Sequence, residues 1–199
     1  MIKTILFDYA GVISPTKDNY VFANRYHKRF KMIPEDLFKK SYKNWDKAAI
    51  GKFPRGMFWK EIGKELNIDP DKLRDLVIST FPIDKKLINF IDKIKDRYTI
   101  VMVSNQIEDW LEKVIDDNNL KTKFHFFINS YTVAAKKPDK KIFLEALKQT
   151  GSKPEETLFI DDSLENIKAA QELNIHTVKF TSFEQFVKEL QKYVDLEDL

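Results

Sequence analysis

The chain has 199 residues, of which 43% are hydrophobic, enough to bury the core of one medium domain with a modest insertion. The 34 Lys and Arg residues nearly balance the 31 Asp and Glu residues, and the net charge of +3 is spread along the chain without a basic block. This pattern argues against a nucleic-acid-binding stripe. No apolar run approaches the roughly 18 residues that a membrane span needs, so no membrane association is expected.

The absence of Cys excludes disulfides and thiolate zinc sites, which fits a reducing, cytoplasmic location. The apolar residues 1–13 are interrupted by Lys3 and Asp8, and no small-residue cleavage site follows them. This segment therefore fails as a signal peptide.

Short apolar runs rich in β-branched and aromatic residues predict buried strands. They lack strict alternation, which is typical of strands covered on both faces of a parallel sheet. Four runs are clear and a fifth, at 124–128, is plausible; the clear ones are 4–7, 98–103, 157–160 and 176–180.

Segments with helical spacing lie between these runs, at 85–96, 108–118, 140–149 and 164–173. Pro138 is expected in the first turn of one helix, and Gly151 and Asn174 are expected to end two of them. Alternating strands and helices predict an α/β fold with an open parallel sheet and right-handed crossovers.

One stretch breaks the alternation. Residues 14–82 show no convincing strand, only helical pattern broken by Pro and Gly. We interpret them as a helical insertion, a cap, between two parts of the core, 1–13 and 83–199. The many aromatic residues of this stretch are expected to form mainly its own small core.

Polar residues follow the predicted strands at the edge where open α/β sheets bind ligands. Each has a simpler interpretation as a helix or turn cap when taken singly. Together they would place carboxylates side by side, which repel one another unless a cation offsets them. Magnesium prefers such oxygen ligands. These residues are Asp8, Ser104, Asn105, Lys137, Asp161 and Asp162.

The ordered segments FDYAGV at 7–12, VSNQ at 103–106, KKPD at 136–139 and FIDDSLENIKAAQELN at 159–174 resemble the four motifs of the haloacid dehalogenase superfamily. The resemblance implies a Rossmann-like sheet of order 5-4-1-2-3 with a helical cap after the first motif. The residues of the first motif are similar to the first motif of a branch that includes the phosphatase domains of epoxide hydrolases and sugar-phosphate phosphatases. A weaker similarity to the caps of that branch lies in Gly51-Lys52-Phe53 and Phe58-Trp59.

The resemblance also implies roles for individual residues. Asp8 matches the nucleophile that forms an aspartyl-phosphate, and Lys137 the lysine that neutralises charge. Ser104 and Asn105 match the phosphate-binding motif. Magnesium is implied between Asp8, the carbonyl of Ala10 and Asp162, with Asp161 nearby, while Asn166 would orient these ligands. The expected partner is a small phosphorylated substrate, possibly a sugar phosphate, and the expected assembly is a monomer or homodimer.

Ala10 departs from the family pattern. Phosphatases of this superfamily usually carry an Asp there, as general acid and base, and an alanine cannot transfer a proton. Losing that help costs about 10² to 10⁴ in rate, so the sequence predicts a magnesium-dependent phosphatase of reduced activity, best on leaving groups that need no proton.

Three alternatives remain open. Ala10 also resembles the motif of phosphonoacetaldehyde hydrolases, for which the candidate Schiff-base lysines are Lys39, Lys40, Lys43 and Lys47. A dehalogenase is disfavoured because its characteristic Tyr is one position away, at Tyr9. A binding or regulatory protein that keeps the fold but turns over negligibly is the third.

Overall fold

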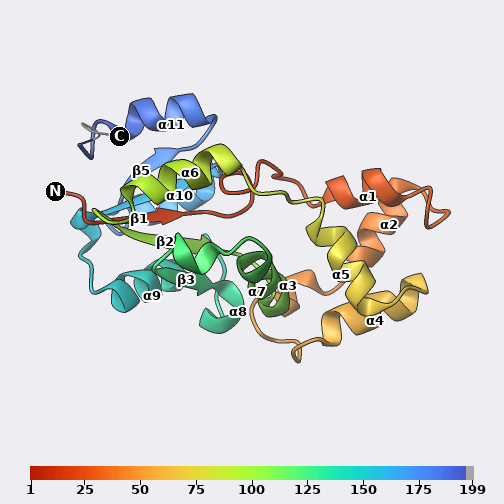
Figure 1. The fold of residues 1–199 in the computed structure, drawn as a ribbon. Coiled ribbons are helices and arrows are strands. Elements are labelled where there is room, and N and C mark those ends of the chain that lie inside the picture. Colours follow the sequence, from red (N-terminus) through yellow and green to blue (C-terminus); the bar gives the residue numbers. More distant parts are fainter. Residues whose placement is uncertain (196–199) are drawn as a thin grey trace.

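In the computed structural model, which describes residues 1–195, a five-stranded parallel sheet forms the centre of the molecule. Its order is β3-β2-β1-β4-β5, which is the order implied by the sequence resemblance. The strands are β1 (Thr4–Phe7), β2 (Thr99–Ser104), β3 (Phe126–Asn129), β4 (Thr157–Asp161) and β5 (His176–Lys179), as Figure 1 shows. All five predicted runs are strands, displaced by no more than two residues at either end.

The two faces of the sheet carry separate hydrophobic cores. Ile5 and Phe7 of β1 belong to one core, whereas Leu6 between them belongs to the other. This follows from the period of two along a strand, and β1 is buried throughout because both faces are covered. Alternating side chains thus serve opposite layers of helices.

Helices α6 (Lys85–Ile94) and α11 (Phe183–Leu190) cover the face that bears Phe7, and α9 (Lys140–Thr150) and α10 (Leu164–Gln171) cover the other (Figure 1). Helix α7 (Glu108–Asp117) follows β2 and adds Trp110 and Leu111 to the first core. Three short elements complete this part of the chain: η1 (Leu120–Thr122), α8 (Ser130–Val133) and η2 (Pro154–Glu156).

Between β1 and α6 the regular elements are all helices, as the sequence predicts, apart from an isolated bridge between Ala10 and Ser14. They are α1 (Tyr20–Tyr26), α2 (Pro34–Ser41), α3 (Trp45–Ala48), α4 (Met57–Leu66) and α5 (Pro70–Ile78). Figure 1 shows α1, α2, α4 and α5 away from the sheet, whereas α3 lies near α7. The exact division of the chain into a cap at 14–82 and a core stays a prediction.

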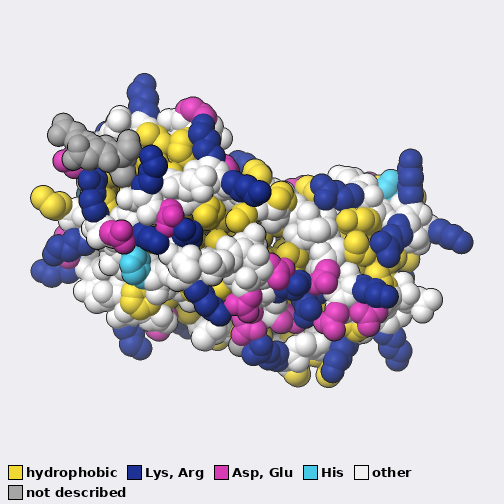
Figure 2. Space-filling view, in the orientation of Figure 1, with side chains coloured by type: hydrophobic (Ala, Val, Ile, Leu, Met, Phe, Trp, Pro, Cys, Tyr) yellow, Lys and Arg dark blue, Asp and Glu magenta, His cyan; other side chains and the backbone are white. Residues whose placement is uncertain are grey.

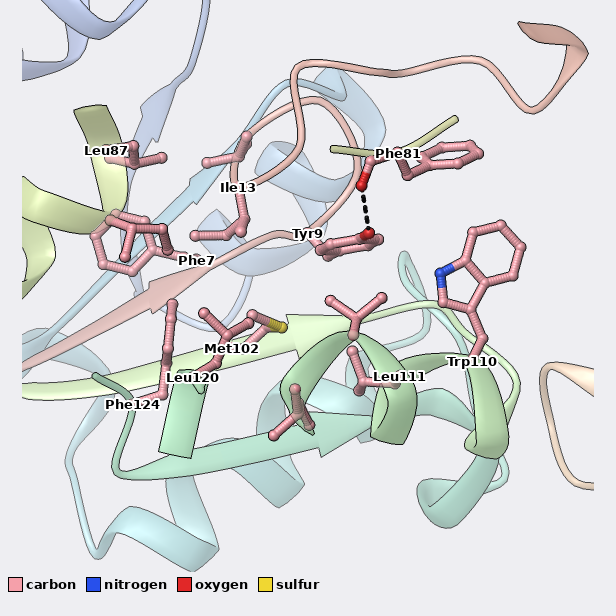
Figure 3. Close-up of a cluster of buried hydrophobic side chains, with 14 of the residues drawn as sticks. Phe7, Tyr9, Ile13, Phe81, Leu87, Met102, Trp110, Leu111, Leu120 and Phe124 are labelled. Carbon is pink, nitrogen blue, oxygen red and sulfur yellow. Dashed lines mark hydrogen bonds between the residues drawn. The ribbon is translucent and has the colours of Figure 1, made fainter. Parts of the chain in front are cut away.

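Aromatic side chains join the inserted helices to the core. Trp110 of α7 lies 5.3 Å from Trp45, 6.0 Å from Trp59 and 5.1 Å from Phe81, measured between ring centroids. Figure 3 shows Trp110 beside Tyr9, whose hydroxyl donates a hydrogen bond of 3.0 Å to the carbonyl of Phe81. The residue after the nucleophile candidate is thereby packed against this aromatic junction.

The start of α9 differs from the sequence-based expectation, which placed a proline in its first turn. Pro138 lies outside the helix, because Asp139 is the N-cap of α9, where its side chain accepts from the backbone of Lys141. Gly151 does end α9, with a φ of +66°. The Asp139 carboxylate accepts a hydrogen bond from a backbone N–H of the first turn of α9, so this helix begins without a proline in its first turn.

Charges are interleaved over the surface. Figure 2 shows Lys and Arg side chains beside Asp and Glu side chains over the face in view, consistent with the dispersed pattern of the sequence. Within residues 1–195, no helix combines the length and the apolar character needed to cross a bilayer.

Candidate active site

Asp8 lies directly after β1, at the carboxyl end of the central strand. Its backbone N–H donates to the carbonyl of Ile160 across the sheet, so the residue continues the pairing of β1 with β4. Its side chain is buried but lines a pocket at the end of the sheet. The neighbouring strand β4 ends in Asp161 and is followed by Asp162. Parallel strands thus bring the predicted acids to one edge, as expected for ligand-binding residues of open α/β sheets.

Lys137 joins two of these acids. Its ammonium nitrogen Nζ lies 2.5 Å from Oδ1 of Asp8 and 2.9 Å from Oδ2 of Asp161, and it donates to the carbonyl of Val103 at 3.0 Å. The side chain is almost completely buried. A buried ammonium with three acceptors is held in place, because losing any of them would leave charge unpaired.

Asp161 is held by further donors. Asn166 on α10 donates through Nδ2 to both carboxylate oxygens, at 3.1 and 3.0 Å, and the backbone N–H of Ser163 donates at 2.7 Å. No side chain caps α10 at its N-cap Ser163. Asp161 therefore fixes Lys137 and Asn166 relative to one another.

Asp162 approaches the turn that follows Asp8. A Cβ placed on Gly11 would lie 2.5 Å from the carboxyl carbon of Asp162, and Gly11 has a φ of +90°. Only glycine fits this position, because any side chain would strain the backbone and displace the carboxylate. Asp162 also pairs with Lys17 at 3.1 Å.

Carboxylate oxygens of Asp8, Asp161 and Asp162 lie within 4.8 Å of one another. Three acids so close, with oxygen ligands only, form a donor set that suits a hard divalent cation such as Mg²⁺. Ala10 contributes to the same pocket wall, although its side chain offers no ligand atom.

The two polar residues at the end of β2 are used differently. Ser104 is buried and lines the pocket. The side-chain amide of Asn105 is committed to the backbone of Lys137, from which it accepts at 2.8 Å and to which it donates at 3.0 Å. Neither residue caps α7, whose N-cap is Ile107. Asn105 thus positions the loop that carries Lys137.

Burial is the largest influence on the pKa values of Asp8 and Lys137. It raises the pKa of Asp8 to about 8, a direction supported by the charge of Asp161 and opposed by the Lys137 ammonium. Burial also disfavours the charge on Lys137, but the carboxylates of Asp161 and Asp8 outweigh this effect and raise the pKa of Lys137. Lys137 is therefore a cation in the folded protein. A further cation beside Asp8 would lower the pKa of that carboxyl.

The pocket has a volume of about 240 Å³ and also contains residues that the sequence analysis did not assign. Lys17, Asn19 and Trp45 come from the segment between β1 and α4, whereas Gln106 and Lys136 are the outermost residues of the motif segments VSNQ and KKPD. Gln106 and Lys136 could have been suspected because they belong to these segments. Lys17, Asn19 and Trp45 have no comparable signal, because they lie in an irregular segment and a one-turn helix.

The four lysines considered for a Schiff base lie elsewhere. Lys40 and Lys43 pair with Glu65 at 3.5 and 3.8 Å, and none of Lys39, Lys40, Lys43 and Lys47 is among the described residues that line the pocket. The structure thus offers no lysine from this group to a substrate beside Asp8.

The parallel sheet, the inserted helices and the acid cluster beside a buried lysine form the arrangement that the motif resemblance implies for the haloacid dehalogenase superfamily. The chain belongs to the haloacid dehalogenase-like hydrolases, whose family model matches residues 2–174.

Solved structures share the fold. A HAD family enzyme of Bacteroides thetaiotaomicron superposes with a TM-score of 0.80 at 24% identity, covering 95% of this chain and 98% of that one. The structure of the same enzyme in complex with magnesium and inorganic phosphate has a TM-score of 0.75 at 22% identity, and the match covers 94% of this chain and 99% of that one. The L-2-haloacid dehalogenase of Xanthobacter autotrophicus has a TM-score of 0.66 at 18% identity, and the match covers 98% of this chain and 86% of that one.

Curated relatives match over shorter segments. Acyl-CoA dehydrogenase family member 10 of Mus musculus is 37% identical over 71 residues, which are 36% of this chain and 7% of that protein. Phosphoglycolate phosphatase 1 of Pseudomonas aeruginosa is 27% identical over 82 residues, 41% of this chain and 30% of that protein. The matches therefore span only a minor part of either relative.

Proposed function

We propose that the chain is a magnesium-dependent phosphatase that hydrolyses a small-molecule phosphate ester, with Asp8 as the nucleophile. The observation that carries this proposal is the convergence of Asp8, Asp161, Asp162 and Lys137 on one pocket. The phosphoglycolate phosphatase relatives and the magnesium and phosphate complex of the Bacteroides enzyme support it.

The donor set fits magnesium. Asp8, Asp162 and the backbone carbonyl of Ala10 would hold the ion, with Asp161 beside them, and Gly11 leaves the space that lets Asp162 approach. When bound, the ion would shield the attacking carboxylate from the anionic phosphate and stabilise charge in the transition state.

The residues of the chain provide the remaining chemistry. A carboxylate oxygen of Asp8 attacks phosphorus, the bond to the leaving oxygen breaks, and an aspartyl-phosphate forms. Water then attacks phosphorus, the bond to Asp8 breaks, and inorganic phosphate leaves. Lys137 offsets negative charge on both the nucleophile and the phosphoryl group, while Ser104 and the backbone N–H of Asn105 donate to phosphoryl oxygens.

Ala10 leaves the proton transfers without a dedicated side chain at the usual position. We infer that activity is reduced on leaving groups that must be protonated, by about 10² to 10⁴. Solvent would supply the proton in that case.

The decisive experiment is a phosphatase screen with p-nitrophenyl phosphate and a panel of sugar phosphates, with and without magnesium, beside the Asp8→Asn variant. We expect turnover that requires magnesium and falls by at least about 10³ in Asp8→Asn, since loss of a nucleophile removes the covalent route. Asp96→Asn, an exposed acid in the turn after α6, is the matched control and should retain full activity.

Turnover that persists in Asp8→Asn would contradict the proposal. Absence of turnover on the whole panel would favour the binding or regulatory alternative, and trapping by borohydride in the presence of an aldehyde substrate would favour the Schiff-base alternative.

A further inference from the structure

Tyr9 directly follows the nucleophile candidate Asp8, and the mechanism above gives it no role. Its side chain is fully buried although it carries a hydroxyl group. The hydroxyl donates a hydrogen bond of 3.0 Å to the carbonyl of Phe81, and the two rings are stacked with their centroids 6.5 Å apart. Figure 3 shows this bond as a dashed line. A buried hydroxyl that bonds a carbonyl 72 residues away in the chain fixes two distant segments to each other.

The backbone of Tyr9 contacts the nucleophile candidate. Its N–H donates to Oδ1 of Asp8 at 2.5 Å, and this is the carboxylate oxygen that the Lys137 ammonium also contacts. Its carbonyl accepts from the backbone N–H of Ser14 at 2.7 Å, within the turn that contains Gly11. The N–H, the carbonyl and the hydroxyl of Tyr9 are therefore all engaged, and one of these groups orients the Asp8 carboxylate.

Phe81 lies where the chain returns from the inserted helices to the core. It is buried in the segment between α5 and α6, and its ring centroid lies 5.1 Å from that of Trp110 in the first turn of α7. The carbonyl that accepts from the Tyr9 hydroxyl is therefore held in place, because close packing leaves its residue little freedom. A side chain bonded to a fixed acceptor restrains the backbone from which it projects.

A second hydroxyl makes the same kind of bond close by. Thr16 donates through Oγ1 to the carbonyl of Thr80 at 2.8 Å, so it reaches the residue next to Phe81. The two bonds join the segments that leave and re-enter the core at neighbouring points. They differ in their origin, because of the two donor residues it is Tyr9 that adjoins Asp8 in the chain. Comparing the two bonds therefore separates attachment of the insertion from placement of the nucleophile.

We propose that Tyr9 is a positioning residue, whose hydroxyl anchors the turn after β1 to the returning segment and so keeps the Asp8 carboxylate oriented for attack on phosphorus. The proposal rests on the proposed function for the role of Asp8. Displacing a reacting group by about 1 Å can cost about 10² in rate, so a hydrogen bond behind the nucleophile can affect turnover without touching the substrate. Loss of this bond should therefore lower kcat and leave KM nearly unchanged.

Steady-state kinetics with p-nitrophenyl phosphate at saturating magnesium is the first test. Tyr9→Phe keeps the ring and removes the hydroxyl, and we expect its kcat to fall about tenfold while KM changes by less than about twofold. Thr16→Val removes the matched hydroxyl and should keep both values within about twofold of the parent. 4-Aminophenylalanine in place of Tyr9 retains a donor at the same end of the ring, so it should restore kcat to within about twofold of the parent.

Calorimetry with beryllofluoride separates positioning from a structural role. With magnesium present, beryllofluoride binds an oxygen of the nucleophilic carboxylate and mimics the phosphoryl group of the intermediate, whereas inorganic phosphate forms no bond to that oxygen. We expect Tyr9→Phe to weaken beryllofluoride binding about tenfold and phosphate binding by less than about twofold. Thr16→Val should weaken neither. Both variants lose one hydrogen bond to a backbone carbonyl, so both should melt at a lower temperature, and a purely structural role would leave the ratio of the two affinities unchanged.

Several outcomes would overturn the role of Tyr9. These are a parental kcat and affinity ratio in Tyr9→Phe, equal weakening of both ligands in that variant, and an equal effect of Thr16→Val. Tyr9→Met fills the same space with a flexible side chain and carries the same comparison if the phenylalanine variant does not fold; parental values there would also overturn the proposal. Absence of beryllofluoride binding in the parent chain would contradict the proposed nucleophile together with the positioning role, so the two failures are distinguishable.

Discussion

Ala10 is the residue at which the chain departs most clearly from the phosphatases it resembles. It lines the pocket two positions after Asp8, where it can offer a backbone carbonyl but no proton. The proposed reaction therefore depends on how readily the leaving oxygen departs as an anion.

Substrates with good leaving groups should accordingly be preferred. We expect aryl and acyl phosphates to turn over at least about 10² times faster than alkyl phosphates, because only the latter need protonation. Steady-state kcat/KM across such a series at saturating magnesium measures this. Equal rates for both classes would show that another group supplies the proton.

A carboxyl group at position 10 should reduce the difference in turnover rate between alkyl and aryl phosphates. In Ala10→Asp we expect turnover of alkyl phosphates to rise about tenfold or more, while aryl phosphates change little. Ala10→Asn has the same shape and cannot act as a general acid, so it should give no such gain. A rise in both variants would point to packing instead of proton transfer.

Gly11 is a second residue whose identity is set by the site. Its φ of +90° and the 2.5 Å approach of its virtual Cβ to Asp162 leave no room for a side chain. We expect Gly11→Ala to raise the magnesium concentration for half-maximal activity by about tenfold or more, since Asp162 would be displaced. Gly56→Ala also has a positive φ but open space around it, and should leave the magnesium requirement unchanged.

The sequence predicted the acids and lysine that the structure brings together, because each directly follows a strand or precedes a helix of the core. The contacts of the Asn105 side chain could not be predicted in the same way. Its amide bonds the backbone of Lys137, which is a tertiary contact between residues 32 apart in the chain. A pattern along the sequence does not record which partner a side-chain amide meets in the folded protein.

At the scale of elements, the contact between α3 and α8 links the insertion to the sheet. Ser130, the first residue of α8, donates to the carbonyl of Ala49 at 2.6 Å in a fully buried position. A Cβ on Gly51 would lie 2.9 Å from the carbonyl of Tyr131, so the two segments approach closely. The wall that carries Trp45 is therefore fixed to the core.

Loss of this hydrogen bond should be measurable. We expect Ser130→Ala to lower the free energy of unfolding by about 1 to 3 kcal/mol, because the carbonyl of Ala49 would be buried without its donor. Denaturant unfolding monitored by circular dichroism gives the value. Thr132→Ala, in the same helix but exposed, should change it by less than about 0.5 kcal/mol, and equal losses would refute the argument.

The strands were predictable as buried apolar runs, and the long helices from their apolar spacing. Two helices were not predicted. Helix α8 has only four residues, which is too short for a periodic signal. Helix α11 follows the last strand, and the ring centroids of its Phe186 and of Phe7 lie 5.9 Å apart. The sequence also placed Pro138 inside α9, whereas Asp139 begins that helix as its cap.

At the scale of the whole molecule, the acid cluster should couple cation binding to stability. The Lys137 ammonium pairs with two of the three acids that lie within 4.8 Å of one another, and a divalent ion bound only by the folded state would favour the ionised form of all three. The sheet brings residues 8 and 161 together, so the cluster exists only when the strands are assembled.

Magnesium should therefore raise the melting temperature. At 100 times its dissociation constant the ion would add about 2.7 kcal/mol, which corresponds to roughly 5 to 10 °C for a chain of this size. The increase should be lost in Asp162→Asn and kept in Asp96→Asn. A melting temperature independent of magnesium up to millimolar levels would argue against the proposed metal site.

All three tryptophans of the chain belong to the junction described above, with Trp110 between Trp45 and Trp59. The intrinsic ultraviolet emission of the protein therefore originates from one place, and Trp45 forms part of the pocket wall. Ligand entry would alter the surroundings of Trp45 directly. The protein thus carries its own optical reporter of pocket occupancy, which can follow binding in real time without an attached dye.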